Sequence, residues 1–267
     1  MAVLKVGRRA LGVAVGRSGS TASCLLLVVS VQLLILGGGN PGLGIYLLSS
    51  WHYYLYWLAF AFGARAFDVF KRDAVVMKAI SVATLATVYL AAPLDLASLA
   101  VIASGILLNV RAAVVLGIDR TYYGHEVAGL PARRVTAFPY SVTAHPMILG
   151  NVAAFGGTLI NDGFRAQWWP LAGLHVALNI GLLVMELAGS RRRRAVRIGG
   201  GLILAGSLFA AILAGLGAGA LATTRVGLAD ALLIAATVAC AGALYRCYGP
   251  SASPLREKPQ EIARRIP

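Results

Sequence analysis

Long apolar runs separated by short polar or glycine-rich breaks make up most of the 267-residue chain. Several of these runs approach the roughly 20 residues that a helix needs to cross a bilayer. Because the runs are solidly apolar and do not alternate with polar residues, they favour helices over strands. The pattern predicts an all-α fold, a polytopic transmembrane helical bundle. Its apolar segments number about eight, at residues 21–36, 45–63, 74–92, 96–117, 146–160, 168–187, 198–222 and 228–245.

Composition supports the same class of protein. The chain is 58% hydrophobic and only 13% charged, whereas a soluble domain carries about 25% charged residues. The three cysteines, Cys24, Cys240 and Cys247, lie in or at the ends of apolar runs. Their positions indicate neither a disulfide framework nor a zinc site, and we expect no metal.

The strongly basic charge, +14, would suit a nucleic-acid-binding protein, but no segment is left for the soluble domain that such binding needs. The excess of lysine and arginine that membrane proteins carry in their cytosolic loops explains the positive charge instead. If the N-terminus is cytosolic, the opposite side of the membrane holds only Arg165 and Arg225 of the 24 basic residues. The interval between the two apolar halves and the run Arg191–Arg194 then share the cytosolic face.

The chain divides into five parts by composition: a basic N-terminal segment (1–20), N-terminal transmembrane helices (21–95), a core (96–197), additional C-terminal transmembrane helices (198–248) and a polar tail (249–267). The basic start followed by a short apolar run predicts a retained signal-anchor helix, with an organelle-targeting sequence as the alternative. We therefore expect a multi-pass protein of the endoplasmic reticulum membrane, or alternatively of a mitochondrial membrane.

Aromatic residues gather near the start of the second apolar run, in SSWHYYLYW. Rings with one polar edge are enriched at the membrane–water interface. We expect His52 to be an interfacial residue of this group and not a ligand.

The central stretch, residues 119–150, is the longest polar interval between the two apolar halves. Lipid cannot satisfy a non-helical backbone, so this stretch must lie in an aqueous loop or line a protein cavity. Gly124 allows a turn or a close backbone approach. Phe138 and His145 each precede a proline and are pushed into extended conformations. Pro146 can open a helix, whose unpaired N–H groups favour a carboxylate or phosphate.

Isolated polar residues in the neighbouring apolar runs also need an explanation. Asn109 and Arg111 lie deep in the fourth run and should face the bundle interior or a cavity, unless Arg111 extends to the interface. The short run 147–160 is rich in Gly and Ala, which suits close helix contact. Glu186 ends an apolar helix and needs a positive partner, either a cationic ligand group or a neighbouring arginine.

Taken in order, the central stretch and its neighbours resemble the phospholipid N-methyltransferases, integral-membrane enzymes that methylate phosphatidylethanolamine and its mono- and dimethyl forms. The resemblance covers about residues 103–194. It is carried by Tyr122-Tyr123-Gly124, by VTAFPY at 135–140, by His145-Pro146-Met147 with Gly150, and by Glu186.

The piece HPMILG at 145–150 is also similar to the isoprenylcysteine carboxyl methyltransferases. The chain departs from the phospholipid family in two places. It has no Gly-x-Gly in the preceding helix, where Gly105 is the nearest glycine, and it has Met185 before a single acid where paired acids are common.

The resemblance implies a membrane methyltransferase core that uses S-adenosylmethionine to methylate phosphatidylethanolamine and/or its methylated derivatives toward phosphatidylcholine. The implied catalytic candidates are the possible bases His125, Glu126 and His145. Arg191, Arg192, Arg193 and Arg194 would hold the lipid phosphate. The implied cofactor residues are Gly105, Asn109, Tyr122, Tyr123, Gly124, Phe138, Pro139, His145, Pro146, Gly150 and Glu186.

Other functions remain open. A prenylcysteine carboxyl methyltransferase or a nicotinamide-dependent lipid reductase would share the architecture. A non-catalytic transporter or lipid-binding protein belongs to another class, although a carrier should show internal repeats, and the two halves of this chain show none. The number of methylation steps and the oligomeric state do not follow from the sequence.

Overall fold

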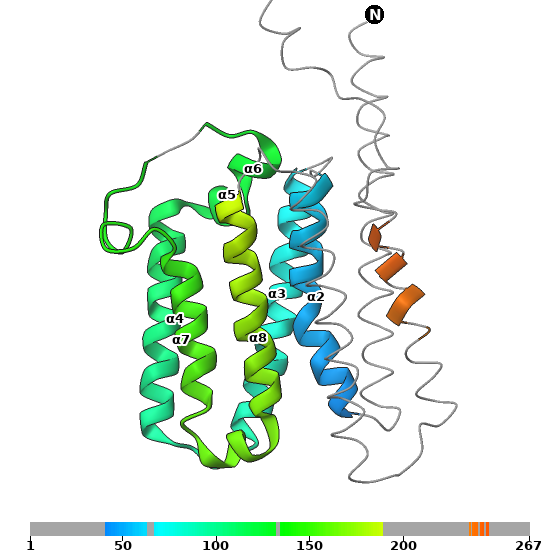
Figure 1. The fold of residues 1–267 in the computed structure, drawn as a ribbon, viewed down its shortest axis with the longest axis vertical. Coiled ribbons are helices and arrows are strands. Elements are labelled where there is room, and N and C mark those ends of the chain that lie inside the picture. The colour runs from blue at the N-terminus through cyan, green and yellow to red at the C-terminus, as the bar shows by residue number, and fades with distance from the viewer. Residues whose placement is uncertain are drawn as a thin grey trace, which may run out of the picture.

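The computed structural model describes residues 41–62, 67–131, 134–188 and, near the C-terminus, residues 235, 237–239, 241, 242, 244 and 245. All regular structure in these residues is helical, which confirms the all-α prediction for this part of the chain (Figure 1). The helices are α2 (Pro41–Phe62), α3 (Phe67–Leu90), α4 (Leu96–Leu116), α5 (Ile118–Thr121), α6 (Gly124–Ala128), α7 (Pro146–Thr158) and α8 (Asp162–Ala188).

Three of the described helices are long and apolar enough to cross a membrane: Phe67–Leu90, Leu96–Leu116 and Asp162–Leu187. This agrees with the predicted association with a membrane. The predicted runs at 21–36 and 198–222, and most of the run at 228–245, lie outside the described residues. The number of eight apolar segments therefore stays a prediction.

Three helices, α2, α3 and α8, begin earlier than the apolar pattern predicts, and α2 begins at Pro41, four residues before its run. The segment RAFDVFKRD was expected to be a connection, but α3 begins within it, at Phe67. Asp68 lies in the first turn, where a carboxylate suits the helix dipole. Helix α8 begins at Asp162, six residues before the apolar run, because the Asn161 side chain accepts a hydrogen bond from the Phe164 N–H (3.1 Å).

Helix α2 forms the centre of the hydrophobic core. Leu55, Leu58 and Ala59 are fully buried, and the neighbouring rings of the SSWHYYLYW segment pack inside the bundle. His52 is only 5% exposed, with its ring centroid 4.0 Å from that of Tyr53. The interfacial position expected for His52 is therefore wrong, because α3, α6, α8 and residues near Ala241 pack around α2.

Helices α4 and α7 make the most extensive helix–helix contact of the described residues. Their backbones approach where Gly105 and Gly150 face each other. A Cβ atom on Gly150 would lie 2.6 Å from the Gly105 carbonyl oxygen, so no larger residue fits at this crossing. The prediction that the small residues of α7 serve close helix contact is confirmed.

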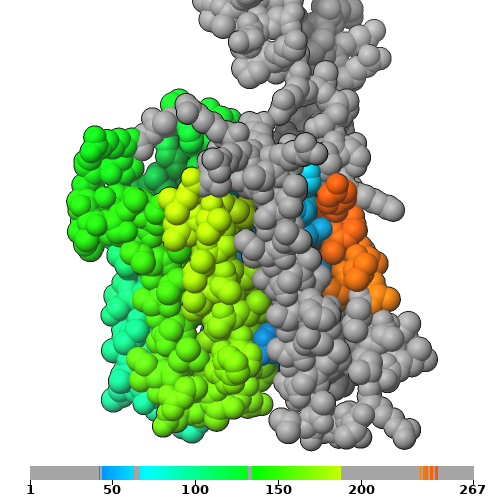
Figure 2. All heavy atoms as spheres, viewed as in Figure 1, coloured from blue at the N-terminus to red at the C-terminus, as the bar shows by residue number. Residues whose placement is uncertain are grey.

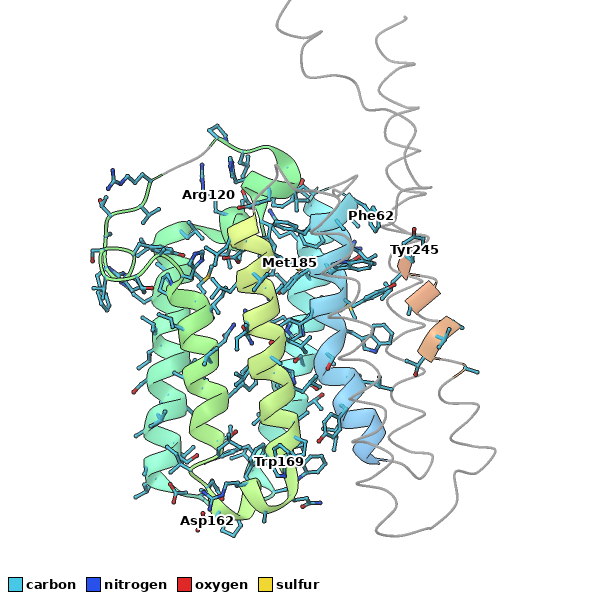
Figure 3. All side chains as sticks on the ribbon, viewed as in Figure 1. Phe62, Arg120, Asp162, Trp169, Met185 and Tyr245 are labelled. Carbon is cyan, nitrogen blue, oxygen red and sulfur yellow. The ribbon has the colours of Figure 1, made fainter. Side chains whose placement is uncertain are left out.

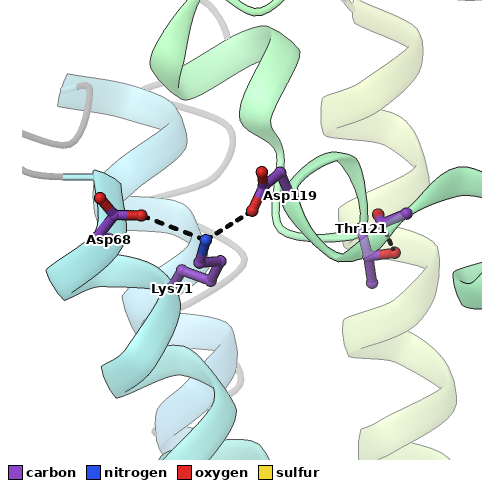
Figure 4. Close-up of polar contacts among 5 residues, drawn as sticks. Asp68, Lys71, Asp119 and Thr121 are labelled. Carbon is purple, nitrogen blue, oxygen red and sulfur yellow. Dashed lines mark hydrogen bonds and ion pairs between the residues drawn. The ribbon is translucent and has the colours of Figure 1, made fainter.

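The bundle has two different ends. The α4–α7 pair and the α2–α3 pair lie on opposite sides of α8, and the central stretch with α5 and α6 covers one end (Figure 1). In the space-filling view, α7 and α8 form a continuous surface below that stretch (Figure 2). Lys71 of α3 contacts Asp119 of α5 (2.6 Å) and Asp68 (3.2 Å), which holds α5 against the bundle (Figure 4).

Candidate active site

A cavity of about 250 Å³ lies at the covered end of the bundle. Its walls come from α2, α3, α4, α7 and α8 and from the central stretch. The lining residues are Tyr56, Lys78, Asn109, Leu116, Arg120, Thr121, Tyr122, Tyr123, Glu126, Tyr140, Ala144, His145, Pro146, Met147, Ile148, Asn151, Asn179, Leu182 and Glu186.

His145 and Glu186 form a contact on the cavity wall. The His145 Nδ1 lies 2.9 Å from Glu186 Oε2, and the two side chains are only 29% and 22% exposed. His145 directly precedes Pro146, the first residue of α7, and Glu186 lies near the end of α8, so the packing of α7 on α8 brings them together. The sequence predicted a cationic ligand group or an arginine as the partner of Glu186, whereas the structure places the imidazole of His145 there, at the start of α7.

Tyr122 and Tyr123 line the cavity from the turn between α5 and α6. Tyr123 adopts a left-handed backbone conformation (φ 61°), which is rare for a residue with a large side chain. Its phenol lies within hydrogen-bonding reach of Glu186. Burial and then the Glu186 charge raise the pKa of Tyr123 well above its ordinary value, so at neutral pH the phenol is a hydrogen-bond donor.

The position after Tyr123 requires glycine. A Cβ atom on Gly124 would lie 2.6 Å from the Asp119 carbonyl oxygen, so the predicted close backbone approach is present. Gly124 acts on the site only by allowing the turn that places Tyr122 and Tyr123.

A row of asparagines crosses the bundle beside the cavity. Asn109 of α4 donates to Asn151 Oδ1 (2.8 Å) and to the Met147 carbonyl (3.0 Å). Asn151 of α7 donates to Asn179 Oδ1 (2.9 Å), and Asn179 of α8 donates to the Tyr53 hydroxyl (2.8 Å). Only Asn109 was predicted. Asn179 lies two helical turns before Glu186, on the same face of α8. This spacing is the sequence pattern that would have indicated Asn179 as a site residue.

The N-terminus of α7 opens onto the same cavity. Pro146 is its first residue, no side chain caps it, and Met147 and Ile148 of its first turn line the cavity. Unpaired N–H groups and the positive end of the helix dipole favour an anionic group at this place.

Other predicted residues lie away from the cavity. Gly105 and Gly150 pack α4 on α7, and Phe138 is 57% exposed. Pro139 is buried but does not line the cavity. The exposed His125 has its Nδ1 2.7 Å from the Leu130 carbonyl oxygen and is not a lining residue.

The cavity thus gathers Asn109, Tyr122, Tyr123, Glu126, His145, Pro146 and Glu186 from the predicted set. Arg191–Arg194 lie outside the described residues. Arg111, which was expected to face the interior or extend to the interface, is exposed. The lining residues Lys78 and Arg120 were not predicted, and Tyr140, which belongs to the VTAFPY motif, was assigned no role in the site.

The fold and the cavity define a helical membrane protein with a partly polar ligand site at one end of its bundle. Residues 94–188 match the family model for phospholipid methyltransferases. This segment, which includes α4 to α8, is similar to the phospholipid methyltransferases. No curated protein and no solved structure matches the chain.

Proposed function

We propose that this protein is an S-adenosylmethionine-dependent N-methyltransferase that acts on phosphatidylethanolamine and/or its mono- and dimethyl derivatives, toward phosphatidylcholine. The observation that supports it best is the contact between His145 and Glu186 on the cavity wall, inside the segment that matches the family. We place the protein in the endoplasmic reticulum membrane, with a mitochondrial membrane as the alternative.

The lining residues suit the charges of this cofactor. Glu186 Oε2 accepts from His145, and a carboxylate has further acceptor positions for an ammonium group. The uncapped start of α7 suits a carboxylate. The rings of Tyr122 and Tyr123 present faces that attract a cation such as a sulfonium. When bound, S-adenosylmethionine supplies a methyl group activated for transfer by its sulfonium.

The protein must align the lipid amine, remove its proton and exclude water. His145 Nδ1 is engaged by Glu186, which leaves Nε2 to accept the proton. Glu186 then stabilises the imidazolium that forms, so the charge stays paired. Glu126, which also lines the cavity, is the alternative base.

Membranes that contain the protein should transfer the labelled methyl of S-adenosylmethionine to phosphatidylethanolamine or its monomethyl form. Membranes from cells without the gene serve as the control, and S-adenosylhomocysteine should suppress the labelling. Label found only as a base-labile ester on prenylcysteine would establish the carboxyl methyltransferase instead. Protection against thermal unfolding by a nicotinamide cofactor, without methyl transfer, would establish the reductase.

A further inference from the structure

Lys78 lines the cavity from α3 and has no partner among the described residues. It belongs to the apolar span Phe67–Leu90, and no ion pair or hydrogen bond of the described residues includes it. Lys71, two turns earlier on the same helix, contacts Asp68 and Asp119. Lys71 is therefore paired with carboxylates, whereas Lys78 has no ion pair among the described residues.

An unpaired ammonium at this depth needs an explanation. Lys78 lies near the middle of α3, at least 11 residues from either end of Phe67–Leu90. The apolar run of α3 begins at Ala74, about 6 Å along the helix axis from Lys78. Charged side chains inside a membrane are costly and face cavities or partners. The cavity is a place where an anion can meet Lys78.

The position of α3 indicates which anionic group Lys78 would bind. The groups suited to the cofactor come from the central stretch, α4, α7 and α8, whereas α3 packs mainly on α2. Another basic lining residue of the described chain, Arg120, donates through Nη2 to the Pro131 carbonyl (3.2 Å), and its buried Nε has no hydrogen-bond partner among the described residues. Lys78 thus supplies an unpaired positive charge from a wall that the cofactor groups do not use.

We propose that the Lys78 ammonium binds the phosphate of the phospholipid substrate, an inference that rests on the proposed function and identifies its lipid-binding group. A two-carbon linker joins the phosphate ester to the amine. Binding of the phosphate at Lys78 therefore restricts how far the amine can move from the methyl donor.

The test compares Lys78→Met, Lys78→Arg and the matched control Lys71→Met. Short-chain phosphatidylethanolamine is the varied substrate, and S-adenosylhomocysteine is titrated calorimetrically. Lys78→Met should raise the lipid KM about 10- to 100-fold, the usual effect of losing a charge-assisted hydrogen bond. Its cofactor affinity should not change. Lys78→Arg should restore most of the lipid affinity, and Lys71→Met should lower thermal stability without changing the lipid KM.

Three results would overturn the proposal. An unchanged lipid KM in Lys78→Met would remove Lys78 from the substrate site. Weaker S-adenosylhomocysteine binding with an unchanged lipid KM would assign the ammonium to the cofactor carboxylate. A loss of kcat that Lys78→Arg does not restore would make Lys78 a proton acceptor, because arginine stays protonated.

A second measurement separates this proposal from the proposed function. Phosphatidylethanolamine should raise the melting temperature of the wild type in detergent more than diacylglycerol with the same chains, and Lys78→Met should abolish the difference. If the wild type transfers no methyl group but still shows this phosphate-dependent stabilisation, the Lys78 site stands and the proposed reaction falls. If methyl transfer occurs and Lys78→Met keeps the full stabilisation, the reaction stands and the Lys78 site falls.

Discussion

His145 and Glu186 are separated by 41 positions in the chain and meet at 2.9 Å. Each residue has a local reason for its place: a proline fixes the backbone after His145, and α8 ends shortly after Glu186. The imidazole orients the carboxylate without using all of its acceptor positions. Glu186 is therefore held in place by the protein and can still accept a hydrogen bond from a ligand.

Glu186→Gln should lower the affinity for S-adenosylhomocysteine by about 1.5–3 kcal/mol, the typical net contribution of a hydrogen bond to a charged group. The amide keeps the size of the side chain and can still accept from His145, so the protein should fold and lipid binding should change little. Calorimetric titration together with a melting curve measures both effects.

Asp162→Asn is the matched control, because Asp162 is an acid of the same helix that lies at the opposite end of the bundle (Figure 3). It should leave cofactor affinity unchanged. If Glu186→Gln instead lowers only the melting temperature, Glu186 is a structural partner of a basic residue. Unchanged affinity with unchanged turnover would exclude it from the site.

Some of the individual residues that line the cavity could be predicted from the sequence. Tyr122, Tyr123, His145 and Glu186 belong to a recognisable order of short motifs, and all four line the cavity. Lys78, Asn151 and Asn179 were not predicted, since a single polar residue in an apolar run belongs to no motif. Only the packing of helices that are distant in sequence shows that these side chains face one space.

At the scale of elements, composition predicted helix contact better than helix boundaries. The small residues of α7 predicted its close packing on α4. The first turns of α3 and α8 contain charged residues and were interpreted as connections, although Asp68 and Asn161 are residues that favour a helix start. Capping residues, and not the apolar pattern alone, determine where these helices begin.

Gly150→Ala should destabilise the protein by about 1–3 kcal/mol, because the added Cβ would lie 2.6 Å from the Gly105 carbonyl oxygen, and backbone cannot move aside as a flexible side chain can. Separation of α4 from α7 should also weaken S-adenosylhomocysteine binding, since Asn109 and Asn151 bond across the same contact. Thermal unfolding with and without S-adenosylhomocysteine measures both effects.

Gly156→Ala provides the matched control on the same helix. A Cβ atom there would meet nothing within 4 Å, so the substitution should be neutral or stabilising by up to about 1 kcal/mol through helix propensity. Equal melting temperatures for the two variants would show that α4 and α7 do not meet at Gly150.

At the scale of the whole molecule, the described helices place the candidate site at one end of the bundle. The central stretch covers that end, and the turns that join α3 to α4 and α7 to α8 lie at the other (Figure 1). The basic bias of the sequence predicts that the covered end faces the cytosol. The site would then open on the side where S-adenosylmethionine is made.

Single cysteines at two exposed positions should test this orientation after Cys24, Cys240 and Cys247 are replaced. Ser141→Cys in the central stretch should react with a membrane-impermeant reagent only from the cytosolic face. Asp162→Cys, at the opposite end of the bundle, should react only from the other face. Labelling of Ser141→Cys from the lumenal face alone would refute the topology and separate the site from cytosolic cofactor.

The glycine contact between α4 and α7 also bears on how far a lipid can be methylated. Two backbones in direct contact cannot spread without losing their packing, so one wall of the cavity is rigid. Each methyl group enlarges the headgroup and replaces an N–H donor with a carbon. If the cavity of about 250 Å³ binds the headgroup, its rigid α4–α7 wall limits the size of the headgroup that fits. If the protein methylates this headgroup as proposed, steric fit as well as reactivity would limit the degree of methylation.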